Sequence, residues 1–104
     1  MAMLPIEFVQ RKIMVIRGMR VMMDFDLAVL YGVPTKRLNE AVKRNANRFP
    51  SDFMFELSRD EFNNLRSQFA TFTAVNRKHL AFCFTEQGVA MLSSVLSSDR
   101  AISV

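Results

Sequence analysis

The stretch that decides the fold of this 104-residue chain is DFDLAVLYGVPTKRLNEAVKRNANR, residues 24–48. Asp24 precedes an apolar pattern with helical spacing, and its carboxylate can accept hydrogen bonds from the first exposed N–H groups of a helix. Gly32 follows about two turns later, where a glycine commonly ends a helix. Val33-Pro34 cannot extend that helix, because proline disfavours α geometry in the residue before it. These signals predict a short helix followed by a tight turn.

A second helix is predicted to begin at Thr35, which we expect to cap it, and to end near residue 47. Ala28, four residues before the turn glycine, is small enough to let the two helices approach closely. The inner face of the second helix is formed by residues that recur at three and four positions, namely Leu38, Ala41, Val42 and Asn45. This layout is typical of a helix-turn-helix, whose second helix can enter a DNA major groove. An ordinary helical hairpin with a solvated basic face is the alternative.

The net positive charge of the chain lies on this second helix. Between Lys36 and Arg48, five basic residues oppose one acid, Glu40, so the segment carries +4. The whole chain has 14 basic and 10 acidic residues, which is also +4, so everything outside the segment sums to zero. A charge excess confined to one short helix is typical of phosphate binding.

At about 100° per residue, the basic side chains turn toward solvent together. Lysines and arginines can reach phosphates, whereas Arg37 and Asn39 near the helix start can match guanine and adenine with paired hydrogen bonds. The candidate DNA-binding residues are Thr35, Lys36, Arg37, Asn39, Lys43, Arg44 and Arg48. Arg77 and Lys78 lie in a predicted loop or wing, where they are either a second contact with the DNA backbone or a solvated loop tip.

The remaining composition excludes several classes of protein. The length and the lack of a Gly- or Ser-rich linker indicate one domain. No apolar run is long enough to span a membrane, and the first residues lack a signal-peptide pattern, so we expect a cytoplasmic protein. The single cysteine, Cys83, rules out an internal disulfide, and with only His79 it cannot complete a zinc site. We expect no enzyme activity and no metal or cofactor.

Outside residues 24–48, short apolar runs alternate with capped helical patterns, which predicts an α+β fold. Residues 13–23 indicate a β-hairpin, with Gly18 supplying a positive φ in its turn. Ser58 and Glu61 have capping-box spacing, and the helix that they begin buries Phe62, Leu65 and Phe69. We expect antiparallel strands at 53–57 and 80–84, the second an isolated one.

The last predicted helix covers residues 86–97, with Thr85 as its cap and Val89, Leu92 and Leu96 on its inner face. Another helix could begin at Ser98 or Asp99.

Several motifs occur in order along the chain: VMMDFDLA (21–28), LYGV (30–33), TKRLNEAVKRN (35–45), RFPSDFMF (48–55), LRSQ (65–68) and FTEQGVAML (84–92). Together they resemble the open-reading-frame-six amino-terminal (ORF-six-N) domain, grouped with the KilA-N and Bro-N DNA-binding domains of phages. The resemblance covers about residues 6–104. It implies a single KilA-N-like DNA-binding domain over residues 1–104 with its C-terminal helix truncated. It also implies a bacterial or prophage protein that acts as an antirepressor or transcriptional regulator.

Double-stranded DNA is therefore the expected partner. The alternative is a protein-interaction module that binds a repressor or another acidic partner through the same basic helix. A homodimer is also compatible with the sequence. A steep salt dependence of the affinity for duplex DNA would favour the first interpretation.

Overall fold

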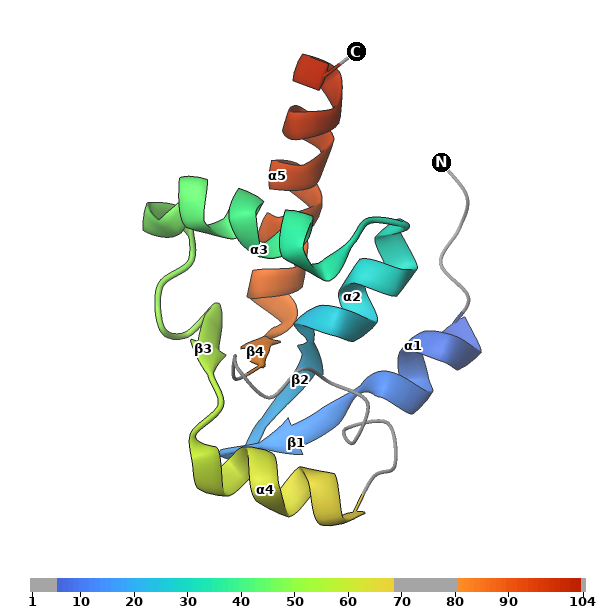
Figure 1. Ribbon diagram of the computed structural model, residues 1–104, viewed down its shortest axis with the longest axis vertical. Helices are drawn as coiled ribbons and strands as arrows, with labels where there is room; N and C mark the ends of the chain where they lie inside the picture. The colour runs from blue at the N-terminus through green and yellow to red at the C-terminus, as the bar shows by residue number, and fades with distance from the viewer. Residues whose placement is uncertain (1–5, 69–80, 104) are drawn as a thin grey trace.

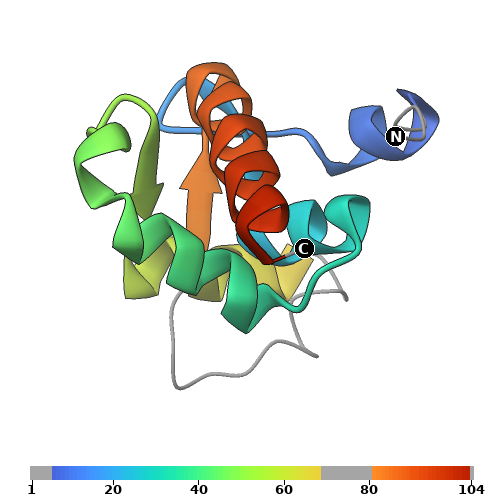
Figure 2. The same ribbon diagram turned by 90° about the horizontal axis from the view of Figure 1, so that it is seen from above.

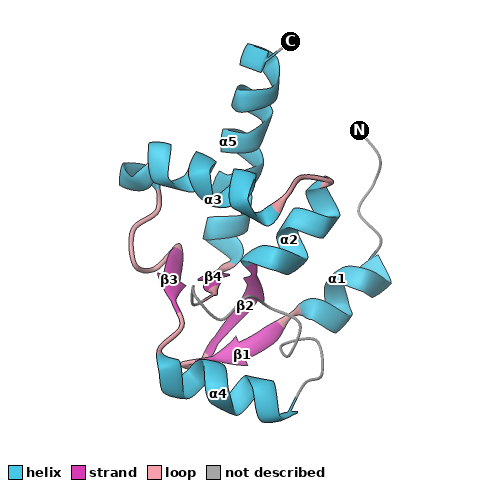
Figure 3. Ribbon diagram, in the orientation of Figure 1, coloured by secondary structure: helices cyan, strands magenta, loops and turns pink. Residues whose placement is uncertain are grey.

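Helices and short strands alternate along the chain in the computed structural model, which describes residues 6–68 and 81–103 (Figure 1). The elements are α1 (Ile6–Lys12), β1 (Met14–Ile16), β2 (Met19–Met23), α2 (Asp24–Tyr31), α3 (Thr35–Arg44), the 3-10 helix η1 (Ala46–Arg48), β3 (Met54–Glu56), α4 (Arg59–Gln68), β4 (Phe82–Phe84) and α5 (Glu86–Ser103). The predicted α+β fold with a β-hairpin is confirmed (Figure 3).

The four strands form one antiparallel sheet in the order β1-β2-β4-β3. The expectation that residues 80–84 form an isolated strand is wrong, because β4 lies in the middle of this sheet. Met22 and Met23 of β2 pair with Phe84 and Cys83, and Phe55 of β3 pairs with Cys83 from the other side. Both Cys83 and Phe84 are completely buried, which explains why this short apolar run takes a central position.

Successive side chains of β2 and β4 point to opposite faces of the sheet, so they divide the core into two clusters. Met22 and Phe84 belong to one cluster, which also contains side chains of α2, α3 and α5. Met23 and Cys83 belong to the other, which is completed by Phe62 of α4. The sheet therefore lies between α4 on one side and the group of α2, α3 and α5 on the other (Figure 1).

The hairpin between β1 and β2 turns through Arg17 and Gly18, both of which have positive φ, at 55° and 75°. The prediction for Gly18 is confirmed, and the pair has the backbone of a two-residue hairpin turn. In this conformation Arg17 donates two hydrogen bonds of 2.8 Å to the carboxylate of Glu61. The predicted capping box of α4 is confirmed, since Ser58 and Glu61 each receive the other's backbone N–H.

The helices α1, α3 and α5 differ from the expectations. The helix α1 was not predicted at all. The helix α5 continues to Ser103 instead of stopping for a new helix at Ser98 or Asp99, because no glycine or proline interrupts it after Gly88. Its predicted cap is confirmed, because the Thr85 hydroxyl accepts the Gly88 N–H at 3.4 Å.

The helix α3 differs at both ends. Thr35 is its first residue rather than its cap: Pro34 occupies the capping position, and its carbonyl accepts the Leu38 N–H at 3.1 Å. At the other end the helix stops at Arg44, because the side-chain amide of Asn45 donates a hydrogen bond to the Ala41 carbonyl at 2.9 Å. The backbone N–H of Asn45 donates instead to Val42, and the chain tightens into η1.

Candidate nucleic-acid interface

Three residues connect α2 to α3. Gly32 ends α2 as predicted, in the left-handed conformation at φ 66° and ψ 35°. Its N–H donates to the carbonyl of Val29 at 3.2 Å, and the N–H of Val33 donates to that of Ala28 at 3.0 Å. This is the Schellman pattern, in which a left-handed residue lets the chain satisfy the last carbonyls of a helix and turn away. The turn therefore sets the direction in which α3 leaves α2.

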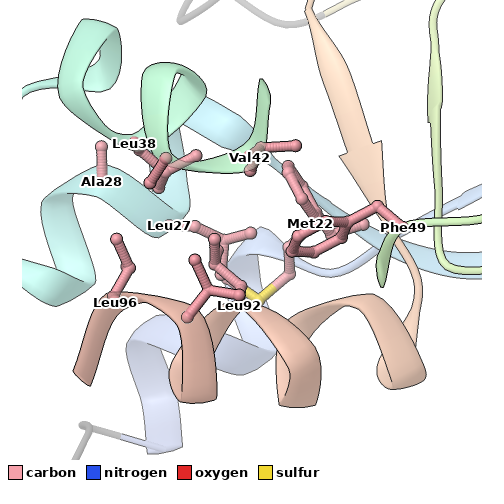
Figure 4. Packing of buried hydrophobic residues seen from close by; sticks show 11 residues of the cluster. Met22, Leu27, Ala28, Leu38, Val42, Phe49, Leu92 and Leu96 are labelled. Atoms are coloured by element: carbon pink, nitrogen blue, oxygen red, sulfur yellow. The ribbon is translucent and has the colours of Figure 1, made fainter. Parts of the chain in front are cut away.

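The inner face of α3 is anchored in the core as the periodicity predicts. Leu38 and Ala41 have no exposed surface, and Val42 is 6% exposed. Figure 4 shows Leu38 and Val42 turned toward α2 and α5, where they join a cluster that includes Leu92 and Leu96. Because α3 is buried along this side, its opposite side is held outward at the edge of the molecule (Figure 2).

Asn39 does not belong to that outward side. Its side-chain nitrogen donates to the Asp24 carboxylate at 3.0 Å, and its side-chain oxygen is buried, with no hydrogen bond to any residue that the structure describes. The predicted role of Asn39 as an adenine reader is therefore corrected to a link between α2 and α3. A local sequence pattern could not reveal this, since the two partners are 15 residues apart.

Asp24 is itself a buried carboxylate, only 4% exposed. Burial raises its pKa above the ordinary value, while the hydrogen bonds from Asn39 and from the backbone N–H of Phe25 act in the opposite direction. Asp24 does not precede α2 as expected: it is the first helical residue, and Met23 occupies the capping position with no side-chain hydrogen bond. The Asp24 carboxylate nevertheless accepts the N–H of Phe25 at 2.7 Å. Asp26 is also buried and has a raised pKa from burial, opposed by Lys12 at 3.8 Å.

The segment after α3 is held down by an aromatic contact. Phe49 is 7% exposed and packs edge-to-face against Phe84, with ring centroids 5.9 Å apart and planes at 87°. This contact fixes the end of η1, on which Arg48 is exposed. Arg48 therefore continues the line of basic residues beyond the end of α3.

Five exposed side chains form what we call the basic face: Lys36, Arg37, Lys43, Arg44 and Arg48. Four of them, all except Arg44, make no ion pair with any residue in the described part of the chain. Elsewhere Arg17 pairs with Glu61, and Lys12 pairs with Asp26. The charges of Lys36, Arg37, Lys43 and Arg48 are thus available to an external anion.

The remaining candidates fall into two groups. Thr35, at the first position of α3, is half-buried, and its hydroxyl has no hydrogen-bond partner among residues 6–68 and 81–103. Arg77, Lys78 and His79 lie outside the described residues, as do Phe69 and the predicted loop at 70–79.

Other kinds of site are not seen in the described residues. No group of three His, Cys, Asp or Glu side chains there could hold a metal ion, and no helix there is long and apolar enough to cross a membrane. Cys83 is buried in the sheet with its sulfur 3.9 Å from that of Met23, and burial raises the pKa of its thiol to about 12. Such a thiol is unreactive at neutral pH.

Comparison with known proteins adds a family. No curated protein and no solved structure matches the chain. The ORF6N domain, however, matches residues 11–95, which include the hairpin, the two helices α2 and α3, the whole sheet and most of α5. The match covers most of the chain and agrees with the motifs that the sequence carries, so the chain belongs to the ORF6N domain family.

Proposed function

We propose that this domain binds double-stranded DNA by inserting α3 into the major groove, as part of a phage- or prophage-derived transcriptional regulator or antirepressor. The observation that carries the proposal is the basic face, in which four exposed cations lack an acidic partner on the described part of the chain. Membership of the phage-associated ORF6N domain family supports the same interpretation.

The dimensions of α3 suit this task. Ten residues span about 15 Å at 1.5 Å each, and the major groove, about 12 Å wide, admits one α-helix. α3 rests on α2 and α5 through its buried face, and no other described helix or strand covers its outer side in either view (Figures 1 and 2). A rigid mounting matters because ordering a helix at the moment of binding would cost affinity.

Within the basic face, the residue types suggest a division of labour. Lys36 and Lys43 are flexible point charges suited to phosphates, whereas the planar guanidinium of Arg37 suits the paired acceptors of guanine. Thr35 and the free N–H groups at the start of α3 offer further donors to a phosphate.

The test is a titration with duplex DNA of mixed sequence at two or more salt concentrations. For the double variant Lys36→Ala/Lys43→Ala we expect weaker binding to every duplex. We also expect a log–log salt slope that is shallower by about two units, because each phosphate contact releases about one counterion. The matched control is Arg20→Ala/Arg59→Ala, which removes two exposed charges from β2 and α4 and should keep the wild-type slope.

Two results would contradict the proposal. One is wild-type affinity for duplex DNA in the folded Lys36/Lys43 variant. The other is tight binding to a repressor or acidic protein with little salt dependence, together with no binding to DNA, which would favour the protein-interaction module.

A further inference from the structure

One exposed side chain on α3 has a charge opposite to that of its neighbours. The carboxylate of Glu40 makes no hydrogen bond and no ion pair with any residue that the structure describes. Its isolation means that the carboxylate is not used to hold the fold together. A lone acid on a surface proposed to meet a polyanion needs a different explanation.

The position of Glu40 is central in the basic face. At about 100° per residue, Lys36 and Lys43 lie about 40° and 60° to one side of it around the helix axis, and Arg44 and Arg37 lie about 40° and 60° to the other side. Leu38 and Ala41 define the buried side of the same helix. Glu40 therefore points outward along the middle of the surface that the cations flank.

The middle and the flanks of a docked helix meet different parts of DNA. Side chains in the middle of the docked face reach the base edges, whereas those on the flanks reach the phosphates along the walls of the groove unless, like Arg37, they lie at the N-terminal end of the helix, which also meets base edges. A carboxylate can only accept hydrogen bonds, and the major groove offers it two amino donors, N4 of cytosine and N6 of adenine. Adenine carries the acceptor N7 beside its amino group, so the N4 amino group of cytosine is the better match. Guanine presents only acceptors at this edge and repels a carboxylate.

We infer that Glu40 is a specificity-determining residue, which accepts a hydrogen bond from cytosine and disfavours duplexes that do not present one at that position. The inference rests on the proposed function, because it requires α3 to lie in the major groove. Its consequence is that the charge of Glu40 acts in two directions. It lowers affinity for DNA of arbitrary sequence, and at the preferred sequence a hydrogen bond offsets that loss.

The experiment compares the wild-type chain with Glu40→Gln, which keeps the size of the side chain and removes its charge. Selection from a library of randomised duplexes should enrich one C·G pair with the wild type, and Glu40→Gln should lose that preference while retaining the others. We expect the preference at that pair to fall by about 5- to 100-fold, and the affinity for unselected duplexes to rise. Glu40 is exposed, so both proteins should fold alike.

The matched control is Asp60→Asn, which removes one negative charge from an exposed position on α4, on the other side of the sheet from α3 (Figure 1). It should raise affinity slightly and leave the selected sequence unchanged. If Glu40→Gln does no more than Asp60→Asn, Glu40 acts only through net charge and the inference is overturned. The same follows if the wild type binds duplexes without selecting any sequence, a result that leaves the proposed function intact. If the wild type binds no duplex at all, the proposed function fails and this inference fails with it.

Discussion

Asn39 of α3 donates its side-chain amide to the Asp24 carboxylate at the start of α2, across 3.0 Å. The bond joins the two helices at a buried point, whereas the side chains of the basic face are exposed to solvent. The orientation of that face relative to the rest of the domain therefore depends in part on the hydrogen bond between Asn39 and Asp24. The first prediction concerns this pair.

Asn39→Ala should lower the free energy of unfolding by about 1–3 kcal/mol, because it leaves a buried carboxylate without one of its donors. Urea denaturation measures the change. The exposed Asn47 provides the control, since Asn47→Ala removes an amide of the same kind from the surface. Selection from randomised duplexes should give the same sequence for folded Asn39→Ala as for the wild type. A changed preference at a single base pair would show that Asn39 reads DNA after all.

Leu38→Ala should destabilise the domain by about 2–5 kcal/mol, because it opens a cavity where α2, α3 and α5 meet. Ala28→Leu should also destabilise it, by about 1–3 kcal/mol, since Ala28 is 2% exposed and an added isobutyl group would overpack the helix contact. Val29→Ala, at a position 67% exposed on α2, should have little effect. Equal denaturation midpoints for Leu38→Ala and Val29→Ala would contradict the packing described for α3.

Gly88→Ala should be poorly tolerated, although glycine is normally unfavourable inside a helix. A Cβ at this position would lie 1.9 Å from the carbonyl oxygen of Phe53, so α5 or the preceding turn would have to move. The free energy of unfolding should fall by about 1–3 kcal/mol or more. Gly32→Ala offers a comparison, because its Cβ meets open space and only the positive φ opposes it, at about 1–2 kcal/mol. Thermal or urea unfolding of the two variants should rank Gly88→Ala as the more damaging.

The stability of the domain should depend on pH through Glu61. Hydrogen bonds from Arg17 and from Ser58 lower the pKa of Glu61 from 4.5 to about 2. A carboxylate whose pKa is lower in the folded state contributes stability above its unfolded pKa, and this contribution disappears as pH falls from about 4.5 to 2.

Glu61→Gln isolates this effect, because glutamine can still complete the capping box while it lacks the charge. Wild type should be more stable than Glu61→Gln by a constant margin above pH 5, and the margin should close between about pH 4.5 and 2. Denaturant midpoints measured across this range provide the comparison. The contributions of Asp24 and Asp26, whose raised pKa values act with the opposite sign, are present in both proteins and cancel. If the difference in stability between wild type and Glu61→Gln stays constant down to pH 2, the ionisation of Glu61 is not coupled to folding.

Arg37→Lys should preserve the charge of the basic face and lose the planar fork of the guanidinium. If Arg37 reads guanine, discrimination at one G·C pair should fall by about 1–3 kcal/mol, while affinity for unselected DNA and its salt slope stay close to wild type. Titration against the selected duplex and a single-pair variant of it measures the difference. Lys43→Arg is the control, since it makes the reverse exchange at a position assigned to phosphates. An equal fall in affinity for every duplex would show that Arg37 contacts the phosphate backbone of DNA instead.

Much of the fold could be predicted because its signals are local. The glycine at the end of α2, the capping box of α4 and the buried row of α3 each depend on residues within a few positions of one another. The same holds for the outward direction of the basic face, since the helical period that buries Leu38 and Ala41 necessarily exposes Lys36 and Lys43. The helix α1 was missed, and the ends of α3 and α5 were misplaced, because helix termini depend on single hydrogen bonds such as that from Asn45 to Ala41.

The sequence by itself determined the class of the fold, the identity and direction of the basic face, and the family to which the chain belongs. Only the tertiary structure decided that β4 is a central strand, that Asn39 turns inward to Asp24, and that Arg17 at the hairpin turn reaches Glu61. The physical reason is separation along the chain. The partners in the two polar contacts are 15 and 44 residues apart, so the geometry that joins them exists only once the sheet and helices have packed.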